Sequence, residues 1–183
     1  MNVHICSNVF DTNKCIELIR NSGNVVFGFD TETTVERMAD KCKTSVIQLY
    51  DGTDYFIFQI YRMWKSDGEI PQSLVKFMKN AQWIKVGVAA DNDSHQLAEH
   101  YDIKCRGVID VQYIATSLGM SSVGMDDLVK IYQCPMQKES KKSIYTNWDI
   151  DLNQRHISYA CVDAYISLYI LNFTPMYFQL LCI

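Results

Sequence analysis

The segment VVFGFDTETT, residues 25–34, joins a run of β-branched and aromatic residues to two acids. The apolar run predicts a buried strand. Asp30 and Glu32 are two residues apart, and side chains at positions i and i+2 of a strand point to the same face. We therefore expect both carboxylates to lie side by side at the end of a central strand.

Two ionised carboxylates that lie this close repel each other, so the fold gains from the pair when a cation binds between them. Mg²⁺ and Mn²⁺ prefer carboxylate oxygens, which makes the pair a candidate metal site. The alternative is a polar turn in which Asp-Thr-Glu-Thr only caps the strand. Acids elsewhere in the chain decide between the two interpretations.

The chain has 183 residues, enough for one domain with a full core, and we expect a single domain over residues 1–183. Its hydrophobic fraction of 48% and charged fraction of 21% are ordinary for a globular protein. No apolar run approaches the roughly 20 residues that span a bilayer. These properties predict a soluble protein with no membrane partner.

The cysteine pattern bears on the compartment. Seven cysteines are scattered without a Cys-x-x-Cys motif, which argues for reduced thiols and against a disulfide framework or a zinc site. Residues 1–10 lack the basic start and apolar core of a signal peptide. We expect an intracellular protein, in the nucleus or the cytoplasm, that is not secreted.

The net charge of −4 argues against a nucleic-acid binder, but only weakly. A metal site concentrates acids that its own cations neutralise, so local basic groups decide the phosphate contacts. The candidates are Lys41 with Lys43, and the cluster of Lys138, Lys141 and Lys142. Either group could instead be part of a solvated loop, and for the first pair the loop is favoured.

Periodicity predicts further strands at 45–50, 55–60, 83–89 and 107–111. Predicted helices cover 11–21, 71–80, 94–101, 111–118, 125–132 and 153–172, the first of them capped by Asp11 or Thr12. Residues 36–43 are predicted as a polar loop. The strands at 45–50 and 55–60 should form an antiparallel meander with the acidic strand, because a turn of hairpin type joins them.

Two further positions offer functional groups. Asp93 follows a predicted strand and precedes a helix, which is where α/β sheets place functional side chains. It could also be a simple helix cap, although Asp91 or Asn92 could serve equally well. Tyr159 and Asp163 are four residues apart on the last helix and lie on one face of it. The alternative for this pair is a half-exposed position on an amphipathic helix.

Together these segments resemble the DEDD superfamily of 3'-5' exonucleases. Its three motifs correspond to Phe29-Asp30-Thr31-Glu32, to Gly87–Asp93 with Leu97, and to Tyr159-Ala160-Cys161-Val162-Asp163-Ala164. The resemblance covers about residues 25–172, and it includes Ile47-Gln48-Leu49, Lys142-Ser143-Ile144 and Asn147-Trp148. The chain looks most like the Werner-syndrome-type exonuclease domain, with ribonuclease D as a more distant relative.

The third motif is similar to the tyrosine branch of the superfamily, the DEDDy type. The histidine branch would place a histidine five residues before the last acid, where this chain has Ser158. We interpret His156 as a structural residue. Thr33 departs from the Werner-type pattern, in which a bulky residue, often Trp, follows the first-motif Glu, and this departure leaves the substrate preference open.

The resemblance implies an α/β fold, a ribonuclease H-like mixed sheet with an antiparallel meander plus parallel strands, flanked by helices. It also implies a 3'-5' exonuclease that uses two Mg²⁺ or Mn²⁺ ions to hydrolyse DNA or RNA from the 3' end to nucleoside 5'-monophosphates. Asp30, Glu32, Asp93 and Asp163 would hold the metals. Tyr159 would orient the attacking water.

The expected partner is a nucleic acid, either a single strand or the 3' end of a duplex. Thr31, Thr33, Lys142 and Trp148 are the candidate substrate contacts, with Lys142 on a phosphate and Trp148 stacked on a base. Trp148 could equally be a core aromatic. Any helicase would be a separate chain, and the apolar tail, residues 175–183, could dock on the body or form a homo-oligomer. The alternative function is a catalytically silent exonuclease-fold module that serves as a nucleic-acid or protein binding platform.

Overall fold

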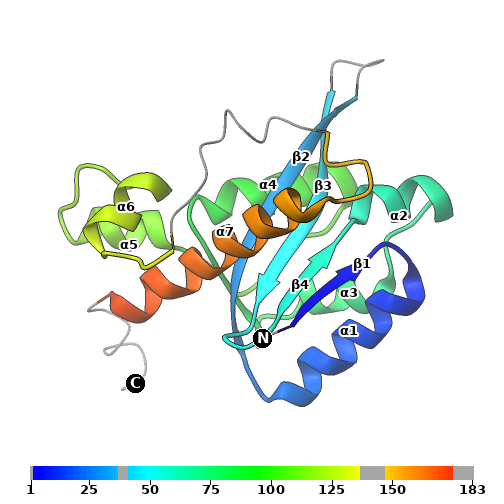
Figure 1. Cartoon of the computed structure of the whole chain (residues 1–183), viewed down its shortest axis with the longest axis horizontal. Helices are drawn as coiled ribbons and strands as arrows, with labels where there is room; N and C mark the ends of the chain where they lie inside the picture. The colour runs from blue at the N-terminus through cyan, green and yellow to red at the C-terminus, as the bar shows by residue number, and fades with distance from the viewer. Residues whose placement is uncertain (1, 37–40, 137–146, 175–183) are drawn as a thin grey trace.

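The computed structural model describes residues 2–36, 41–136 and 147–174, and a six-stranded sheet forms its centre (Figure 1). The strands are β1 (Val3–Cys6), β2 (Val26–Glu36), β3 (Lys41–Tyr50), β4 (Tyr55–Phe58), β5 (Ile84–Gly87) and β6 (Val108–Asp110). Their order across the sheet is β1-β4-β3-β2-β5-β6. The pairs β2–β3 and β3–β4 are antiparallel, and the pairs β1–β4, β2–β5 and β5–β6 are parallel.

The helices lie on both faces of this sheet. They are α1 (Val9–Ser22), α2 (Ile60–Asp67), α3 (Gln72–Met78), α4 (Ala90–Tyr101), α5 (Val111–Ser117), α6 (Met125–Ile131) and α7 (Gln154–Phe173). α7 crosses one face, and α1, α3 and α4 cover the other (Figure 1). A mixed sheet with an antiparallel centre and helices on both faces confirms the predicted fold class.

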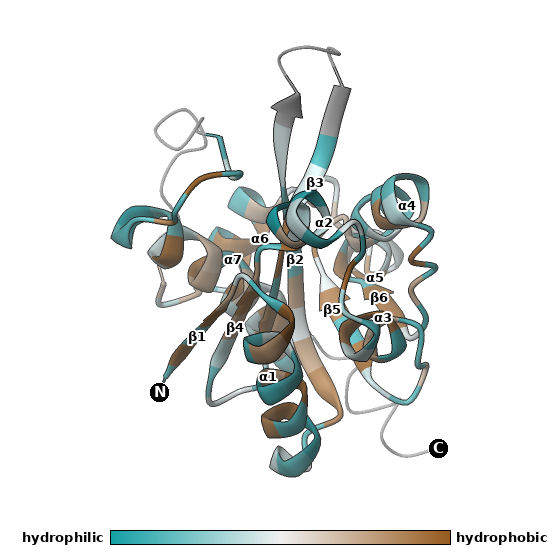
Figure 2. Ribbon diagram, turned by 90° about the vertical axis from the view of Figure 1, so that its right-hand side faces the viewer, coloured by the Kyte–Doolittle hydropathy of each residue, from teal (hydrophilic) through white to brown (hydrophobic). Residues whose placement is uncertain are grey.

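The core lies mainly between the sheet and the helices of the second face. Phe27 and Phe29 of β2 are fully buried there, in one cluster with residues of α1, α3 and α4 such as Ile19, Phe77 and Leu97. Figure 2 shows the apolar residues of the strands at the centre, with hydrophilic residues on the outer sides of α2 and α4. β2 therefore uses its odd-numbered residues for the core and leaves its even-numbered residues to the α7 face.

Most predicted elements occur within a few residues of their expected bounds, but β1 and α2 are absent from the prediction. β1 has four residues, too few for a clear alternation of polar and apolar side chains. α2 begins at Ile60, within the predicted strand 55–60, and β4 ends at Phe58. The apolar run that predicts a long strand is therefore shared by a short strand and the first turn of a helix.

Two other predictions are wrong in their bounds. The described residues of the predicted loop at 36–43 belong to strands, because β2 continues to Glu36 and β3 already begins at Lys41. The first helix begins at Val9, and its cap is Asn8, whose side-chain oxygen accepts a hydrogen bond from the Asp11 backbone N–H at 2.9 Å. The lysine cluster of Lys138, Lys141 and Lys142 and the apolar tail lie outside the described residues.

Gly28 sets the distance between α7 and the sheet. It lies in β2 on the face that also carries Asp30 and Glu32. A Cβ atom at this position would lie 1.9 Å from the backbone oxygen of Ala164 and 3.1 Å from the Cβ of Leu168, both in α7. Because glycine has no Cβ, the helix backbone can pack directly against the strand, one side-chain position before the two acids.

Gly28→Ala is expected to lower the free energy of unfolding by about 3 kcal/mol, because the added methyl group meets a backbone oxygen that has no rotamer to change. Urea unfolding followed by circular dichroism measures the loss. Gly124→Ala is the matched control, since its φ is −65° and a Cβ there meets only Asp127 Oδ2, at 3.6 Å. The control should change by less than about 1 kcal/mol. Equal losses in both variants would contradict the role of Gly28.

Candidate active site

Three of the predicted metal ligands meet where β2 passes under α7. Asp30 and Glu32 extend from the same face of β2, and Asp163 extends from α7 one residue before Ala164, the residue that touches Gly28. Each of the three carboxylates offers an oxygen, and these oxygens lie within 4.8 Å of one another. Asp163 is fully buried, and Asp30 and Glu32 are partly buried. The strand spacing and the helix spacing therefore deliver their acids to one point, as the sequence predicts.

The chemistry of this donor set fits a hard divalent cation. Two ionised carboxylates at 4.8 Å repel each other by roughly 3 kcal/mol at an effective dielectric constant of about 20. Mg²⁺ and Mn²⁺ are bound by carboxylate oxygens of this kind. A bound divalent cation would turn the repulsion among Asp30, Glu32 and Asp163 into attraction, so these residues are suited to hold one.

Tyr159 lies beside the three carboxylates, one turn before Asp163 on α7. Its side chain is only 5% exposed. Burial raises the pKa of the Tyr159 phenol well above its usual range, and the charges of Asp163, Glu32 and Asp30 and a hydrogen bond with Asp163 raise this pKa further. All three acids thus lie close enough to the phenol of Tyr159 to act on it electrostatically.

Asp93 contacts the same strand from the opposite face. Its Oδ1 accepts a hydrogen bond of 2.5 Å from the hydroxyl of Thr31, the residue between Asp30 and Glu32 in β2. Asp93 is not part of the three-carboxylate group within the described residues. The structure thus brings Asp93 to the strand that carries the first two acids, where the Thr31 hydroxyl contacts Asp93.

The start of α4 differs from the prediction. The helix begins at Ala90, so Asp91, Asn92 and Asp93 all lie in its first turn and none of them is its N-cap. The N-cap residue is Ala89, in a left-handed conformation with φ of 62°. The N-terminal end of α4 is capped instead by the buried carboxylate of Asp110, the last residue of β6.

Asp110 accepts hydrogen bonds from three backbone N–H groups. They belong to Ala89 at 3.1 Å, to Asp91 at 3.3 Å and to Gln112 in the first turn of α5 at 2.9 Å. One carboxylate therefore caps α4 and α5 and holds the strained Ala89, whose conformation costs of order 1 kcal/mol or more. Sequence reasoning missed this role, although an acid at the end of a strand and directly before a helix is a recognisable cap signal.

Of the predicted substrate contacts, Thr33 lies at an irregularity next to the site. Glu32 pairs with Val46 and Thr33 pairs with Thr44, so β3 has one extra residue, Ser45, at this point. Such bulges are common beside active sites, where they redirect side chains. Thr33 is partly exposed, and Lys142 lies outside the described residues.

Trp148 occupies the core position that the sequence left open as an alternative. It is 3% exposed and packs with Val46 and Ile57 of the sheet and with Tyr159, whose ring centroid is 6.1 Å away. In this position the indole packs against the side chain of Tyr159 and is too buried for a base to stack on it. His156 is structural, as predicted, because it is buried and its Nδ1 accepts a hydrogen bond from the Asn153 backbone N–H in the capping box of α7.

Gln48 is a site neighbour that the sequence analysis gave no role. It is the residue of β3 directly opposite Asp30, and its side chain is 1% exposed. Neither its amide oxygen nor its amide nitrogen has a hydrogen-bond partner among the described residues. A polar residue that alternates with apolar ones on the same face as Asp30 is the signal that could have identified it.

None of the described helices is both long enough and apolar enough to cross a bilayer.

The comparisons with known proteins agree with this geometry. The chain is 27% identical to the R431 protein of Acanthamoeba polyphaga mimivirus, named as a 3'-5' exonuclease, over 80% of this chain and 39% of that protein. It is 29% identical to a 3'-5' exonuclease of Arabidopsis thaliana, over 54% of this chain and 35% of that protein. The chain thus spans about two fifths or less of the length of these relatives.

Solved structures share the fold at low identity. The exonuclease domain of Aedes aegypti Nibbler superposes with a TM-score of 0.75 at 16% identity, over 98% of this chain and 89% of that chain. Trypanosoma brucei RNase D in complex with the RNA U12 superposes with a TM-score of 0.78 at 16% identity, over 95% and 62%. The EXD2 exonuclease domain soaked in Mn and Mg gives 0.56 at 20% identity, over 99% and 94%.

The family described as 3'-5' exonuclease matches residues 3–173, which is nearly the whole chain and includes every described residue of the site. These neighbours have the ribonuclease H-like exonuclease fold, and the mixed sheet with α7 across one face is the same architecture. Because the family match covers residues 3–173 and agrees with the sheet and with the acids gathered at β2 and α7, the chain belongs to the 3'-5' exonuclease family.

Proposed function

We propose that this chain is a metal-dependent 3'-5' exonuclease of the DEDDy type that releases nucleoside 5'-monophosphates from DNA or RNA. The observation that carries the proposal is the meeting of Asp30, Glu32 and Asp163 beside the buried phenol of Tyr159. Family membership supports the reaction class, and the donor set supports the metal. The Werner-type subtype rests on the motif residues, in which Thr33 replaces the usual bulky side chain.

In this proposal Asp30, Glu32 and Asp163 would hold one Mg²⁺ or Mn²⁺ ion, and Asp30 and Asp93 would help to hold a second. When bound, the ions supply positive charge to the attacking and leaving oxygens of the phosphodiester. The hydrogen bond from Thr31 orients the Asp93 carboxylate. The EXD2 exonuclease domain was soaked in Mn and Mg, and this treatment of a related fold is consistent with the choice of these two metals here.

Tyr159 acts on the attacking water. A protonated phenol donates one hydrogen bond and accepts others, so it can fix the direction of a water molecule without taking its proton. Packing of Trp148 and Val46 against the ring keeps the hydroxyl beside the carboxylates. We propose that Tyr159 orients the water for attack in line with the scissile bond.

The substrate is proposed to be the 3' end of a nucleic-acid strand. Thr33, which follows Glu32 at the bulge, is proposed to contact the terminal nucleotide, and Lys142 a phosphate. The RNA in the RNase D complex is consistent with this class of substrate.

We propose an intracellular location, nuclear or cytoplasmic, because the cysteines follow no disulfide pattern. Among the described residues, the free thiols are Cys6, Cys15, Cys105, Cys134 and Cys161. A homo-oligomer or a separate helicase partner remains a proposal from the sequence.

Asp30→Ala is expected to reduce the shortening of a 5'-labelled oligonucleotide by about 10³-fold, because it removes a ligand shared by both ions. The assay uses single-stranded DNA, recessed-3' duplex DNA and RNA, each with Mg²⁺ and with Mn²⁺. A chelator should abolish the wild-type activity and added Mn²⁺ should restore it. Asp126→Ala, at an exposed acid of α6, is the control and should keep wild-type rates. Undiminished degradation by Asp30→Ala would refute the proposal.

Tyr159→Phe is expected to lower kcat roughly 10²-fold while Mn²⁺ affinity stays within about twofold of wild type, because it removes the hydroxyl that orients the water and leaves every proposed metal-binding carboxylate in place. Single-turnover kinetics and calorimetric Mn²⁺ titration of the same preparation separate the two effects. A parallel loss of Mn²⁺ affinity would assign Tyr159 to the metal site instead.

A further inference from the structure

Gln48 has an unusual environment for an amide. Its side chain is 1% exposed, and both of its polar atoms lack a hydrogen-bond partner within the part of the chain that the structure describes. Gln59 provides a comparison in the same protein, since it is 3% exposed and its Nε2 donates to the Ile150 carbonyl at 2.9 Å. Buried amides are nearly always paired, so the isolated amide of Gln48 calls for a partner.

The register of the sheet determines which way Gln48 faces. It pairs with Asp30 on one side and with Ile57 on the other, and directly opposite residues point to the same face. That face is the α7 face, because Ile57 packs in one cluster with Trp148 and Tyr159. Gln48 is therefore the polar neighbour of Asp30 beneath α7.

The neighbours of Gln48 along β3 locate it relative to α7. Val46, two residues earlier, packs against Tyr159 and Ala160. Tyr50, two residues later, packs with Ala164 and Leu168. Gln48 lies between these two contacts, so its amide faces the portion of α7 that carries Asp163.

We infer that Gln48 is a positioning residue of the metal centre, an inference that rests on the proposed function. Its amide nitrogen donates to a carboxylate oxygen of Asp30 when that carboxylate turns toward a bound cation. Its amide oxygen faces the same centre as an acceptor for water. Residues in this relation to a metal ligand fix the ligand's orientation, and their loss weakens metal binding about 10- to 100-fold.

The test compares wild type with Gln48→Met, which keeps the length of the side chain and removes both polar atoms. Calorimetry should show Mn²⁺ affinity reduced by about 10-fold or more. Thermal unfolding of the metal-free protein should show no loss of Tm, since the replaced amide has no partner to lose. Gln59→Met is the matched control and should lose metal-free stability, because it leaves the Ile150 carbonyl unpaired.

Equal Mn²⁺ affinity of Gln48→Met and wild type would overturn the role of Gln48 and leave the proposed function intact. A wild-type protein that binds Mn²⁺ no better than Asp30→Ala would overturn the proposed function and this inference with it. Gln48→Leu is the second variant, with the same expected results, and it covers the case in which Gln48→Met does not fold.

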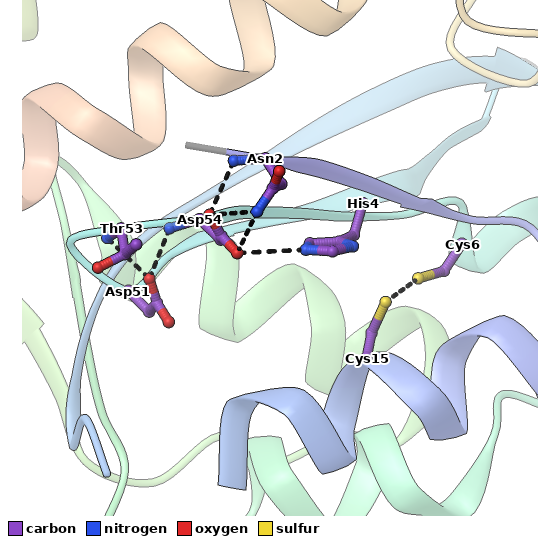
Figure 3. A network of polar contacts seen from close by, with 7 residues as sticks. All are labelled: Asn2, His4, Cys6, Cys15, Asp51, Thr53 and Asp54. Carbon is purple, nitrogen blue, oxygen red and sulfur yellow. Dashed lines mark hydrogen bonds and ion pairs between the residues drawn. The ribbon is translucent and has the colours of Figure 1, made fainter. Parts of the chain in front are cut away.

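A separate observation concerns two cysteines far from the site. Cys6 ends β1 and Cys15 lies in α1, and both are buried. Their sulfur atoms are 3.1 Å apart, with the Cys6 thiol donating to the Cys15 sulfur (Figure 3). A disulfide bond is about 2.05 Å long, so closing it needs a movement of about 1 Å.

We propose that Cys6 and Cys15 form a disulfide on exposure to a peroxide. One cysteine loses its proton and attacks a peroxide oxygen, which gives a sulfenic acid and a hydroxide that takes up that proton to become water. The second thiol then attacks the sulfenic sulfur, forms the disulfide and releases another water. Two thiols and one hydrogen peroxide thus give one disulfide and two waters. β1 is an edge strand that pairs with β4, and local opening of such an edge admits a small oxidant.

Intact mass spectrometry after treatment with hydrogen peroxide should show a loss of about 2 Da, and peptide mapping should link Cys6 to Cys15. Dithiothreitol should reverse the change, and the oxidised protein should unfold at a higher temperature because the bond restricts the unfolded chain. Cys6→Ser and Cys15→Ser should prevent the linkage, and Cys134→Ser should retain it. A wild-type protein in which Cys6 and Cys15 stay unlinked, or are linked only to other cysteines, would overturn the proposal.

Discussion

The contact between Gly28 and the backbone of Ala164 is the constraint on which the site depends. It brings a strand and a helix closer together than two elements with side chains at this point could come. The next residue on that face of β2 is Asp30, and the residue before Ala164 is Asp163, so the contact also fixes the distance between two acids from opposite ends of the sequence. The acidic site thus depends on the absence of a side chain at Gly28, which lets the backbones of β2 and α7 pack directly against each other.

Around this contact, the protein holds together groups that repel one another. Asp30 and Glu32 are fixed by pairing with Gln48 and Val46 of β3. Asp163 is fixed by a helix whose first turn has a complete capping box at Asn153 and His156. The free energy that keeps the acids together comes from apolar packing on both faces of the sheet, including the clusters that hold α7 against it. A protein built in this way gains stability when a cation binds, because the ligand binds the folded state and not the unfolded one.

Much of the site could be predicted from the sequence because its residues are local pairs. Asp30 and Glu32 have strand spacing, and Tyr159 and Asp163 have helix spacing, so each pair shares a face whatever the rest of the fold does. The partner of Asp93 could not be predicted, since Thr31 is distant in the chain and meets Asp93 only through the packing of α4 on the sheet. The burial of Trp148 could not be predicted either, because an aromatic side chain suits both a core and a binding surface, and only the packing of the fold decides between them.

The missed elements have a similar explanation. The run at 55–60 contains one polar residue, Gln59, directly after Phe58, where β4 ends opposite Ile47 of β3. Gln59 is the N-cap residue of α2, but a single polar residue among apolar ones also fits a continuing strand. The strands β2 and β3 include residues 36 and 41–43 of the predicted polar loop, because cross-strand pairs such as Glu36 with Lys41 hold them in extended form, and a single-sequence pattern does not contain that pairing. Gln48 is missed because its significance comes from the partner it lacks, which only the packed structure reveals.

The double cap at Asp110 has a consequence for how the molecule tolerates change. β6 is the outermost strand on its side of the sheet, and Asp110 contributes no oxygen to the acidic cluster, yet its carboxylate anchors the turn that begins the helix of Asp93. The edge of the sheet is therefore coupled through hydrogen bonds to the candidate site. A substitution at Asp110 would leave all the acids of that site in the sequence and still displace the helix that carries Asp93.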